Sequence, residues 1–188
     1  MDRKNYLLQI AALAQSYGFV PLGIKDKIPR FKNWQNVRID PNDPEKTIRR
    51  IAHLYSSGLV NNIAILTGSP SGLVVIDVDV PALTWWTELL RINGGLPETF
   101  MVQTPSGGLH YYFKYDDRTA QFRNMNKILN QNIDFRTNGG IIVFPGSMDH
   151  STGVSYLVLG GYHNARPTIS EMPNWLVELL KYNQQLRA

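Results

Sequence analysis

Residues 73–80 read Leu73-Val74-Val75-Ile76-Asp77-Val78-Asp79-Val80, an apolar, β-branched run with two acids near its end. Such a run is typical of a buried strand, where carboxylates are rare unless they have a partner. Residues two apart share one face of a strand, and their α-carbons are about 6.6 Å apart. Two carboxylates so placed can converge on divalent ions spaced about 3.5–4 Å. The alternative is a strand end with two solvated acids.

A third acid, Asp134, lies in the short apolar run Ile133-Asp134-Phe135-Arg136. If this run is a neighbouring strand, it brings Asp134 beside Asp77 and Asp79. Three carboxylates repel one another unless cations neutralise them, and such hard oxygen ligands favour Mg²⁺ or Mn²⁺. Arg136 shares the strand face of Asp134, so it either faces the same site or simply pairs with Asp134.

The rest of the chain alternates strands and helices, which predicts an α/β or α+β fold in one domain or two tightly joined lobes. Apolar residues at helical spacing predict helices over 6–17, 44–57, 81–92 and 170–180, with Asp43 and Ser170 as caps of the second and the last. Short apolar runs predict strands over 19–24, 62–66, 73–78, 100–103, 109–115, 133–136, 141–144 and 154–159. A tight turn is expected between the strands 62–66 and 73–78.

Composition excludes several kinds of site. The 188 residues include no cysteine, so disulfides, thiolate nucleophiles and cysteine zinc sites are ruled out. The N-terminal region has no apolar stretch long enough for a signal or membrane helix, so we expect an intracellular, cytoplasmic protein with no membrane partner. The formal net charge of +4 leans toward a polyanionic partner such as a nucleic acid.

A glycine-rich loop, Thr104-Pro105-Ser106-Gly107-Gly108, joins two expected strands and leads to His110. Glycines let backbone N–H groups approach an anion closely, and the Ser106 hydroxyl can add a donor. His110 could donate a hydrogen bond to a phosphate, and its alternative role is structural. The loop is not a Walker motif, because no Gly-Lys-Ser/Thr follows it.

A second loop, residues 25–36, is basic and carries Lys25, Lys27, Arg30 and Lys32. Closely placed prolines, Pro29 within the loop and Pro21 just before it, argue against a helix. Lysine and arginine in such a loop can bind nucleic-acid phosphates in a salt-sensitive manner. The alternative is a solvated basic loop without a ligand.

Taken in order, these segments resemble the bifunctional primase–polymerase family of the archaeo-eukaryotic primase superfamily. Residues 27–34, with Lys27-Ile28-Pro29 and Trp34, are similar to its basic N-terminal loop, and residues 62–79 are similar to its first motif. Residues 104–110 are similar to the second motif, whose serine and histidine hold the incoming nucleotide. Residues 133–147 are similar to the third, with one departure at Gly146, where the family often has a second proline. The likeness runs from about residue 5 to about residue 180.

The resemblance implies a two-lobed primase–polymerase fold, in which an N-terminal α/β lobe packs on an RRM-like lobe with a mixed β-sheet. The acids would lie on the sheet between the lobes. Two divalent ions, Mg²⁺ or Mn²⁺, would be held by the catalytic residues Asp77, Asp79 and Asp134, and no zinc is implied. The implied nucleotide-binding residues are Ser106, Gly107, His110, Arg136 and Ser147, and the implied nucleic-acid contacts are Lys25, Lys27, Arg30 and Lys32.

The implied activity is template-directed nucleotidyl transfer, which makes primers or extends DNA or RNA strands from dNTPs or NTPs. Two alternatives remain: a metal-dependent nuclease, in which water attacks, and a non-catalytic module that binds nucleic acid. The presence of all three acids argues against the module. Residues 1–188 are expected to form one catalytic domain. Because such domains are often fused to a helicase, the resemblance also allows the chain to be the N-terminal part of a longer replication protein of a cell, plasmid, phage or virus.

Overall fold

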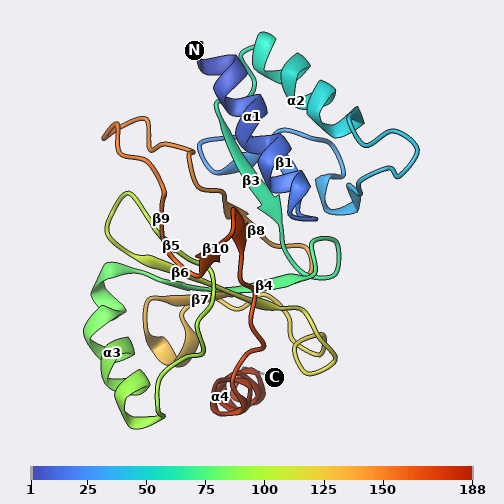
Figure 1. Ribbon diagram of the computed structural model, residues 1–188. Coiled ribbons are helices and arrows are strands. Elements are labelled where there is room, and N and C mark those ends of the chain that lie inside the picture. Colours follow the sequence, from blue (N-terminus) through green and yellow to red (C-terminus); the bar gives the residue numbers. More distant parts are fainter. Residues whose placement is uncertain (1, 188) are drawn as a thin grey trace.

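Two lobes, each built on its own β-sheet, make up the fold (Figure 1). The structure, a computed structural model, describes residues 2–187 apart from the side chain at position 130. In the N-terminal lobe, helices α1 (Arg3–Ser16) and α2 (Lys46–Ser56) pack on strand β1 of a four-stranded sheet. The sheet has the order β2-β1-β3-β8, with β1 (Val20–Lys25), β2 (Ile28–Pro29), β3 (Asn62–Leu66) and β8 (Ile141–Val143).

The second lobe is a five-stranded sheet whose outer face is covered by helices α3 (Leu83–Ile92) and α4 (Asn174–Gln185). Its order is β7-β4-β6-β5-β9, with β4 (Leu73–Val78), β5 (Met101–Gln103), β6 (Leu109–Lys114), β7 (Ile133–Arg136) and β9 (Leu157–Gly160). The short elements are β10 (Tyr162–His163), β11 (Arg166–Pro167) and the 3₁₀ turns η1 (Trp34–Asn36), η2 (Val80–Ala82) and η3 (Ile128–Asn130). Within residues 2–187, no helix is long and apolar enough to cross a bilayer.

Strand β4 contributes to the cores of both lobes. Successive side chains point to opposite faces of a strand. Leu73 and Val75 join the core of the N-terminal lobe, whereas residues 74, 76 and 78 join the core beneath α3 and α4. Burial on both faces accounts for the continuous apolar run in the sequence. The same alternation places Asp77 on the face that looks toward the N-terminal lobe.

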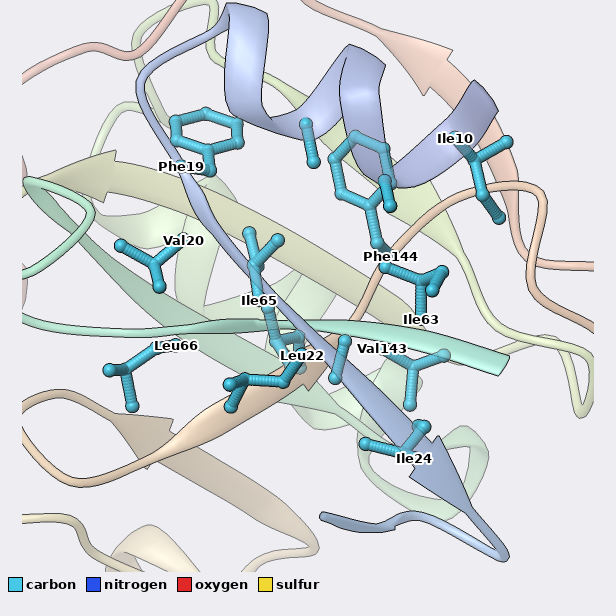
Figure 2. Packing of buried hydrophobic residues seen from close by; sticks show 14 of the residues in the cluster. Ile10, Phe19, Val20, Leu22, Ile24, Ile63, Ile65, Leu66, Val143 and Phe144 are labelled. Atoms are coloured by element: carbon cyan, nitrogen blue, oxygen red, sulfur yellow. The ribbon is translucent and has the colours of Figure 1, made fainter. Parts of the chain in front are cut away.

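The N-terminal core fills the space between α1 and its sheet (Figure 2). Ile10 comes from α1, Leu22 from β1 and Ile65 from β3, and all three are buried. Phe19 and Phe144 pack edge to face with their ring centroids 6.5 Å apart. This packing fixes β8 and the β1–β2 hairpin, which both border the cavity described below.

The structure confirms the α+β class and the two-lobed arrangement, but the expected mixed sheet is antiparallel. Every pair of neighbouring strands in the two large sheets runs antiparallel. An isolated parallel bridge joins Phe113 to Ser170. Residues 62–66 and 73–78 are strands as predicted, yet the turn between them carries the chain from one sheet to the other.

Two predicted helix caps are wrong. Helix α2 begins at Lys46, and the Asp43 carboxylate pairs with Arg49 at 2.5 Å instead of capping. Helix α4 begins at Asn174, because the residue before a proline disfavours helical geometry and Pro173 precedes the helix. The Ser170 hydroxyl donates to the Glu98 carbonyl at 2.6 Å.

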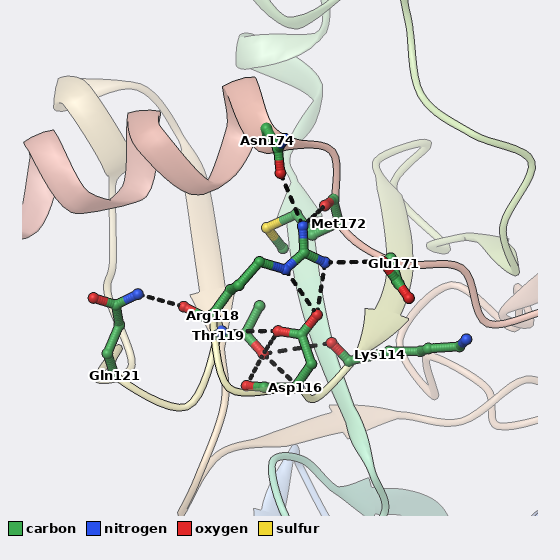
Figure 3. A network of polar contacts seen from close by, with 8 residues as sticks. All are labelled: Lys114, Asp116, Arg118, Thr119, Gln121, Glu171, Met172 and Asn174. Carbon is green, nitrogen blue, oxygen red and sulfur yellow. Dashed lines mark hydrogen bonds and ion pairs between the residues drawn. The ribbon is translucent and has the colours of Figure 1, made fainter.

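An arginine network ties the loop after β6 to the start of α4 (Figure 3). The Arg118 guanidinium pairs with the Asp116 carboxylate at 2.6 Å and donates to the Asn174 side chain at 3.0 Å and the Met172 carbonyl at 3.2 Å. The pKa of Asp116 lies below its usual range because Arg118 and Thr119 hydrogen-bond to its charged form, which outweighs the opposing effect of its burial. The network holds the outer helix on the sheet, away from the cavity described next.

Candidate active site

The β-sheet register brings three of the predicted residues together. Strand β4 lies between β6 and β7, and Asp77 is directly opposite His110 on one side and Asp134 on the other. Directly opposite residues in antiparallel strands have Cβ atoms about 4.5–5.5 Å apart. Residues far apart in the chain therefore meet at Asp77, which no local pattern in the sequence could establish.

A cavity of about 440 Å³ opens beside this point, between the two lobes. Both acids of the β4 end, Asp77 and Asp79, line it. Its walls also include β8, the glycine-rich loop and the β1–β2 hairpin. Four further residues predicted to bind nucleotide or nucleic acid line it: Lys27, Ser106, His110 and Arg136. The cavity thus combines carboxylates with groups that bind anions.

Asp77 is destabilised in its charged form. The pKa of Asp77 is raised to about 7, mainly by burial and also by the neighbouring carboxylates of Asp79 and Asp134, against the lowering effect of Arg136 and Lys27. Its side chain is 22% exposed, so a ligand in the cavity can reach it. A bound cation would relieve both the burial and the repulsion.

His110 lies at the buried side of the cavity, with 3% of its surface exposed. Burial lowers the pKa of His110 to about 3, helped by the positive charges of Lys27 and Arg136. Its Nε2 lies 3.4 Å from Oδ1 of Asp77, a contact the ring makes in its neutral form. Its Nδ1 is buried and has no hydrogen-bond partner in the part of the chain that the structure describes. The ring therefore retains unused hydrogen-bonding capacity beside the cavity.

The glycine-rich loop packs tightly against the end of β4. A Cβ on Gly108 would lie 2.6 Å from the Val78 carbonyl oxygen, so no larger residue fits there without moving the loop. The N–H of Gly107 donates to the Thr104 carbonyl at 2.9 Å, so this donor is already used within the loop. The Ser106 hydroxyl lies 3.0 Å from the Thr104 hydroxyl and faces the cavity.

Asp134 has both carboxylate oxygens engaged. Oδ2 pairs with Nη2 of Arg136 at 2.5 Å, and Oδ1 accepts a hydrogen bond from the Lys127 backbone N–H at 2.9 Å. Arg136 is among the residues that line the cavity, whereas Asp134 is not. Both interpretations of the pair thus retain support, since Asp134 is next to Asp77 and is also paired with Arg136.

Lys27 reaches the cavity from a strained turn. Asp26 and Lys27 form the two-residue turn between β1 and β2, and both have positive φ, 53° and 62°. This turn type favours asparagine, aspartate or glycine at its first position and glycine at its second, so Lys27 carries a conformational cost of order 1 kcal/mol. Lys27 therefore occupies the turn at the expense of local stability, which points to a functional role.

Of the basic residues of that loop, Lys27 is the one among the residues that line this cavity. The Lys25 ammonium donates to the Gly58 carbonyl at 3.1 Å. Arg30 is exposed just beyond β2. Lys32 lines a different cavity in the N-terminal lobe. Lys27 and Lys32, both predicted to bind nucleic acid, therefore line separate cavities.

Ser147, which is predicted to contact the nucleotide, lies in the segment after β8 and outside the residues that line the cavity. This residue is fully buried, and its hydroxyl donates to the Ile63 carbonyl at 2.8 Å and accepts from the Ile63 N–H at 3.0 Å. With both hydrogen-bonding directions used, the side chain joins the segment after β8 to β3. These contacts give Ser147 a structural role in joining the two segments, and its predicted nucleotide contact stays a prediction.

Residues from all of the motif segments identified in the sequence thus line one cavity, which combines carboxylates with anion-binding groups. A family model described as "Bifunctional DNA primase/polymerase, N-terminal" matches residues 9–175. The chain belongs to this family. A comparison with curated proteins finds no match. Family membership supports nucleotidyl transfer of the primase or polymerase type, with nucleotide and nucleic-acid substrates.

For a primase–polymerase domain, the carboxylates have to suit a divalent ion. Within residues 2–187, no three His, Asp, Glu or Cys side chains lie close enough together to hold a metal by themselves. Mg²⁺, however, usually keeps several waters and binds through one or two carboxylates together with substrate phosphates. Asp77 and Asp79 supply two such carboxylates, and the pKa of Asp77 is raised by its burial and by the carboxylates of Asp79 and Asp134, effects that a bound cation would offset. The pair fits a divalent ion that arrives with a nucleotide.

Several residues of this primase–polymerase cavity were missed in the sequence. Asn124 accepts a hydrogen bond from the Thr137 N–H at 2.8 Å and donates to the Asn138 carbonyl at 2.9 Å, which fixes the turn before β8. Asp149 and Tyr156 also line the cavity, and the Tyr156 ring lies 5.8 Å from that of His110. These residues carry no local motif, and only their position in the fold reveals them.

Proposed function

We propose that this domain catalyses template-directed nucleotidyl transfer, making primers or extending DNA or RNA strands from dNTPs or NTPs. One observation carries the proposal. The end of β4 presents Asp77 and Asp79 to the same cavity that Ser106, His110 and Arg136 line. A nucleoside triphosphate in this cavity would meet anion-binding groups at its phosphates and carboxylates where a divalent ion is required.

Two divalent ions, Mg²⁺ or Mn²⁺, are part of the proposal, with Asp77 and Asp79 as their main protein ligands. Such ions would activate the attacking 3′-hydroxyl and neutralise the triphosphate and the leaving pyrophosphate. Asp134 is proposed as the third carboxylate because it is directly opposite Asp77. In that role it would have to give up its pairing with Arg136.

The chain's own cations would bind and orient the triphosphate. Arg136 has a planar fork of donors suited to two phosphate oxygens, and Lys27 adds a point charge from the β1–β2 turn. The Ser106 hydroxyl and the His110 ring add neutral donors. Because these groups are held in place before the nucleotide arrives, they would stabilise charge that develops during transfer.

The proposed partners are a single-stranded template and a primer strand. Lys25, Lys27, Arg30 and Lys32 remain the proposed phosphate contacts, with Lys27 shared between the nucleotide and the strand. A helicase or another replication protein as partner remains a prediction. The same acids would also serve a nuclease, so the test has to separate synthesis from cleavage.

The test is extension of a labelled template with and without a supplied primer, in Mg²⁺ and in Mn²⁺. Asp77→Asn with Asp79→Asn serves as the inactive control. Products longer than the primer that vanish in this control would support the proposal. A parallel reaction lacks nucleotides, and strand shortening there would assign the site to a nuclease. If the protein is folded and strands are neither lengthened nor shortened, the result would favour a non-catalytic module that binds nucleic acid.

A further inference from the structure

A second cavity, of about 510 Å³, lies in the N-terminal lobe between residues 31–41 and the start of α2. Its charged wall has four cations and one carboxylate: Lys32, Arg38, Lys46, Arg50 and Asp40. Asp40 lies 3.6 Å from the Lys46 ammonium. The whole chain has a formal net charge of only +4, so this one cavity concentrates much of its positive excess.

Arg50 is held in place without an acidic partner. Its guanidinium carbon lies 4.1 Å from the centroid of the buried Phe31 ring. In the described part of the chain, no carboxylate lies within 4.0 Å of it, whereas its neighbour Arg49 pairs with Asp43 at 2.5 Å. A guanidinium fixed by stacking keeps its N–H donors available for the oxygens of a phosphate.

The other donors around Arg50 suit the same ligand. Helix α2 begins at Lys46 without a side-chain cap, and Thr47 of its first turn lines the cavity. A helix N-terminus carries a partial positive charge and free N–H groups, which favour a phosphate. Asn33 and Asn36 add side-chain amides to the opposite wall. An anion with several oxygens matches this wall better than an apolar ligand.

The short segment 32–36 separates this cavity from the candidate active site. Trp34 lines the active-site cavity, whereas Lys32, Asn33 and Asn36 line the cationic one. Trp34 therefore lies in sequence between residues of the two cavities, and a strand of several nucleotides that occupies both would run past it. An aromatic ring on such a path is a stacking platform for an unpaired base.

We propose that the cationic cavity around Arg50 binds backbone phosphates of the single-stranded template and leads that strand past Trp34 to the active site. The proposal rests on the proposed function, because a bound strand is a template only if the domain copies it. The binding of the strand can be tested without catalysis. The cavity would take phosphates of any base sequence, because its donors are cations, amides and a helix N-terminus. Binding is therefore expected to depend strongly on salt.

The test is binding of a fluorescent oligothymidylate with a 5′-hydroxyl, measured over a series of salt concentrations without nucleotide or metal. Each phosphate contact contributes about 0.7 to the slope of log affinity against log salt for a single strand. Arg50→Gln and Lys32→Gln are each expected to lower the slope by about that amount, and the double variant by about twice as much. Arg50→Lys keeps the charge, so its slope should return toward that of the parent.

Two controls separate the cavity from general charge. Arg91→Gln removes the same charge from α3, where Arg91 is paired with Glu88 at 2.7 Å. Arg49→Gln removes it from α2 itself, outside the cavity. Both are expected to leave the slope near that of the parent. If the slopes of Arg50→Gln and Lys32→Gln equal those of the two controls, the proposal is wrong.

Inorganic tripolyphosphate distinguishes a strand from a terminal triphosphate. If Arg50→Gln weakens tripolyphosphate binding but leaves oligothymidylate binding unchanged, the cavity binds a triphosphate end and the strand proposal is wrong. The same experiments distinguish a failure of this proposal from a failure of the proposed function. If strand binding depends on Arg50 but the parent protein synthesises nothing, the cavity binds the strand and the proposed polymerase activity is wrong. If the parent synthesises strands but strand binding does not depend on Arg50, the polymerase activity stands and the proposal for the cavity is wrong.

Discussion

Asp77 and His110 lie directly opposite each other in the β4–β6 pair, with His110 Nε2 3.4 Å from Asp77 Oδ1. Burial raises the pKa of the acid to about 7 and lowers the pKa of the ring to about 3. Both groups therefore disfavour their charged forms, although an ionised acid is needed to bind a metal. A metal–nucleotide complex would supply the cation that favours the ionised acid.

Asp77→Asn is expected to stabilise the metal-free protein while it abolishes synthesis. The folded pKa of Asp77 is about 7 and the unfolded value is about 3.9, so between them the folded state binds the proton more tightly. Stability due to this group is therefore lost as pH rises from about 4 to about 7. The variant should melt higher than the parent above neutral pH, by at least the ~2 °C that 1 kcal/mol produces at this size.

Thermal melts in a metal chelator at several pH values provide the measurement. The gain should shrink as the pH falls toward 4, where the parent's Asp77 is protonated in the folded state and partly so in the unfolded state. The exposed Asp117→Asn is the matched control, because it removes one acid outside the cavity. A variant that melts below the parent at every pH, or that still extends primers fully, would contradict the assignment.

His110→Ala is expected to raise the KM for nucleotide by about ten- to a hundredfold, the effect of one hydrogen bond to a charged group. Template binding should change little, because His110 lies deep in the active-site cavity. His110→Gln, which keeps an N–H donor, should recover part of the loss. Since the pKa of His110 is about 3, the ring should add no inflection to the KM profile around neutral pH. If the nucleotide titrations of the parent and of His110→Ala coincide, His110 does not contact the nucleotide and its role is structural.

Ser147→Ala separates a structural role from a nucleotide contact. The change leaves the buried Ile63 N–H without its partner at 3.0 Å, which costs about 1–3 kcal/mol. We expect a melting temperature lower by at least about 2 °C and an unchanged KM for nucleotide. A raised KM with unchanged melting would restore the role that the resemblance implied for this residue.

The predicted elements agree well with the structure where period and composition are unambiguous. The runs 62–66, 73–78 and 133–136 are strands with those bounds, because the first two are short and mostly apolar and the third alternates apolar with charged residues. The caps failed because several polar residues precede each helix, and tertiary contacts decide which one is used. Asp43 pairs with Arg49, and Ser170 binds Glu98.

The site was predictable in part for a different reason. Asp77 and Asp79 stand out because acids are rare in an apolar strand. Their meeting with His110 and Asp134 depends on the strand order β7-β4-β6, which sequence periodicity does not contain. Ser147 was assigned by its place in a motif, and only its burial against Ile63 shows that its hydroxyl is already used. The separation of Lys32 from Lys27 likewise appears only in three dimensions.

Asp134→Asn tests whether Asp134 binds metal or only neutralises Arg136. If the acid is a ligand, the single variant should lose synthesis, and its affinity for Mn²⁺ in the presence of nucleotide should fall. Neutralising Arg136 as well should not restore either property. If the acid is only a partner of Arg136, a neutral pair of similar size should leave Mn²⁺ binding intact, because no buried charge is then left unpaired.

The pair Asp116–Arg118 offers a closely matched control for Asp134. It has the same spacing in sequence and a similar separation, 2.6 Å against 2.5 Å, and its acid is 26% exposed against 23%. It lies in the network at the start of α4 and does not line the active-site cavity (Figure 3). Asp116→Asn should therefore lower stability by breaking a comparable ion pair but leave Mn²⁺ affinity unchanged. If Asp134→Asn behaves in the same way, Asp134 is a structural acid, and the metal site consists of Asp77 and Asp79 with the nucleotide's own phosphates.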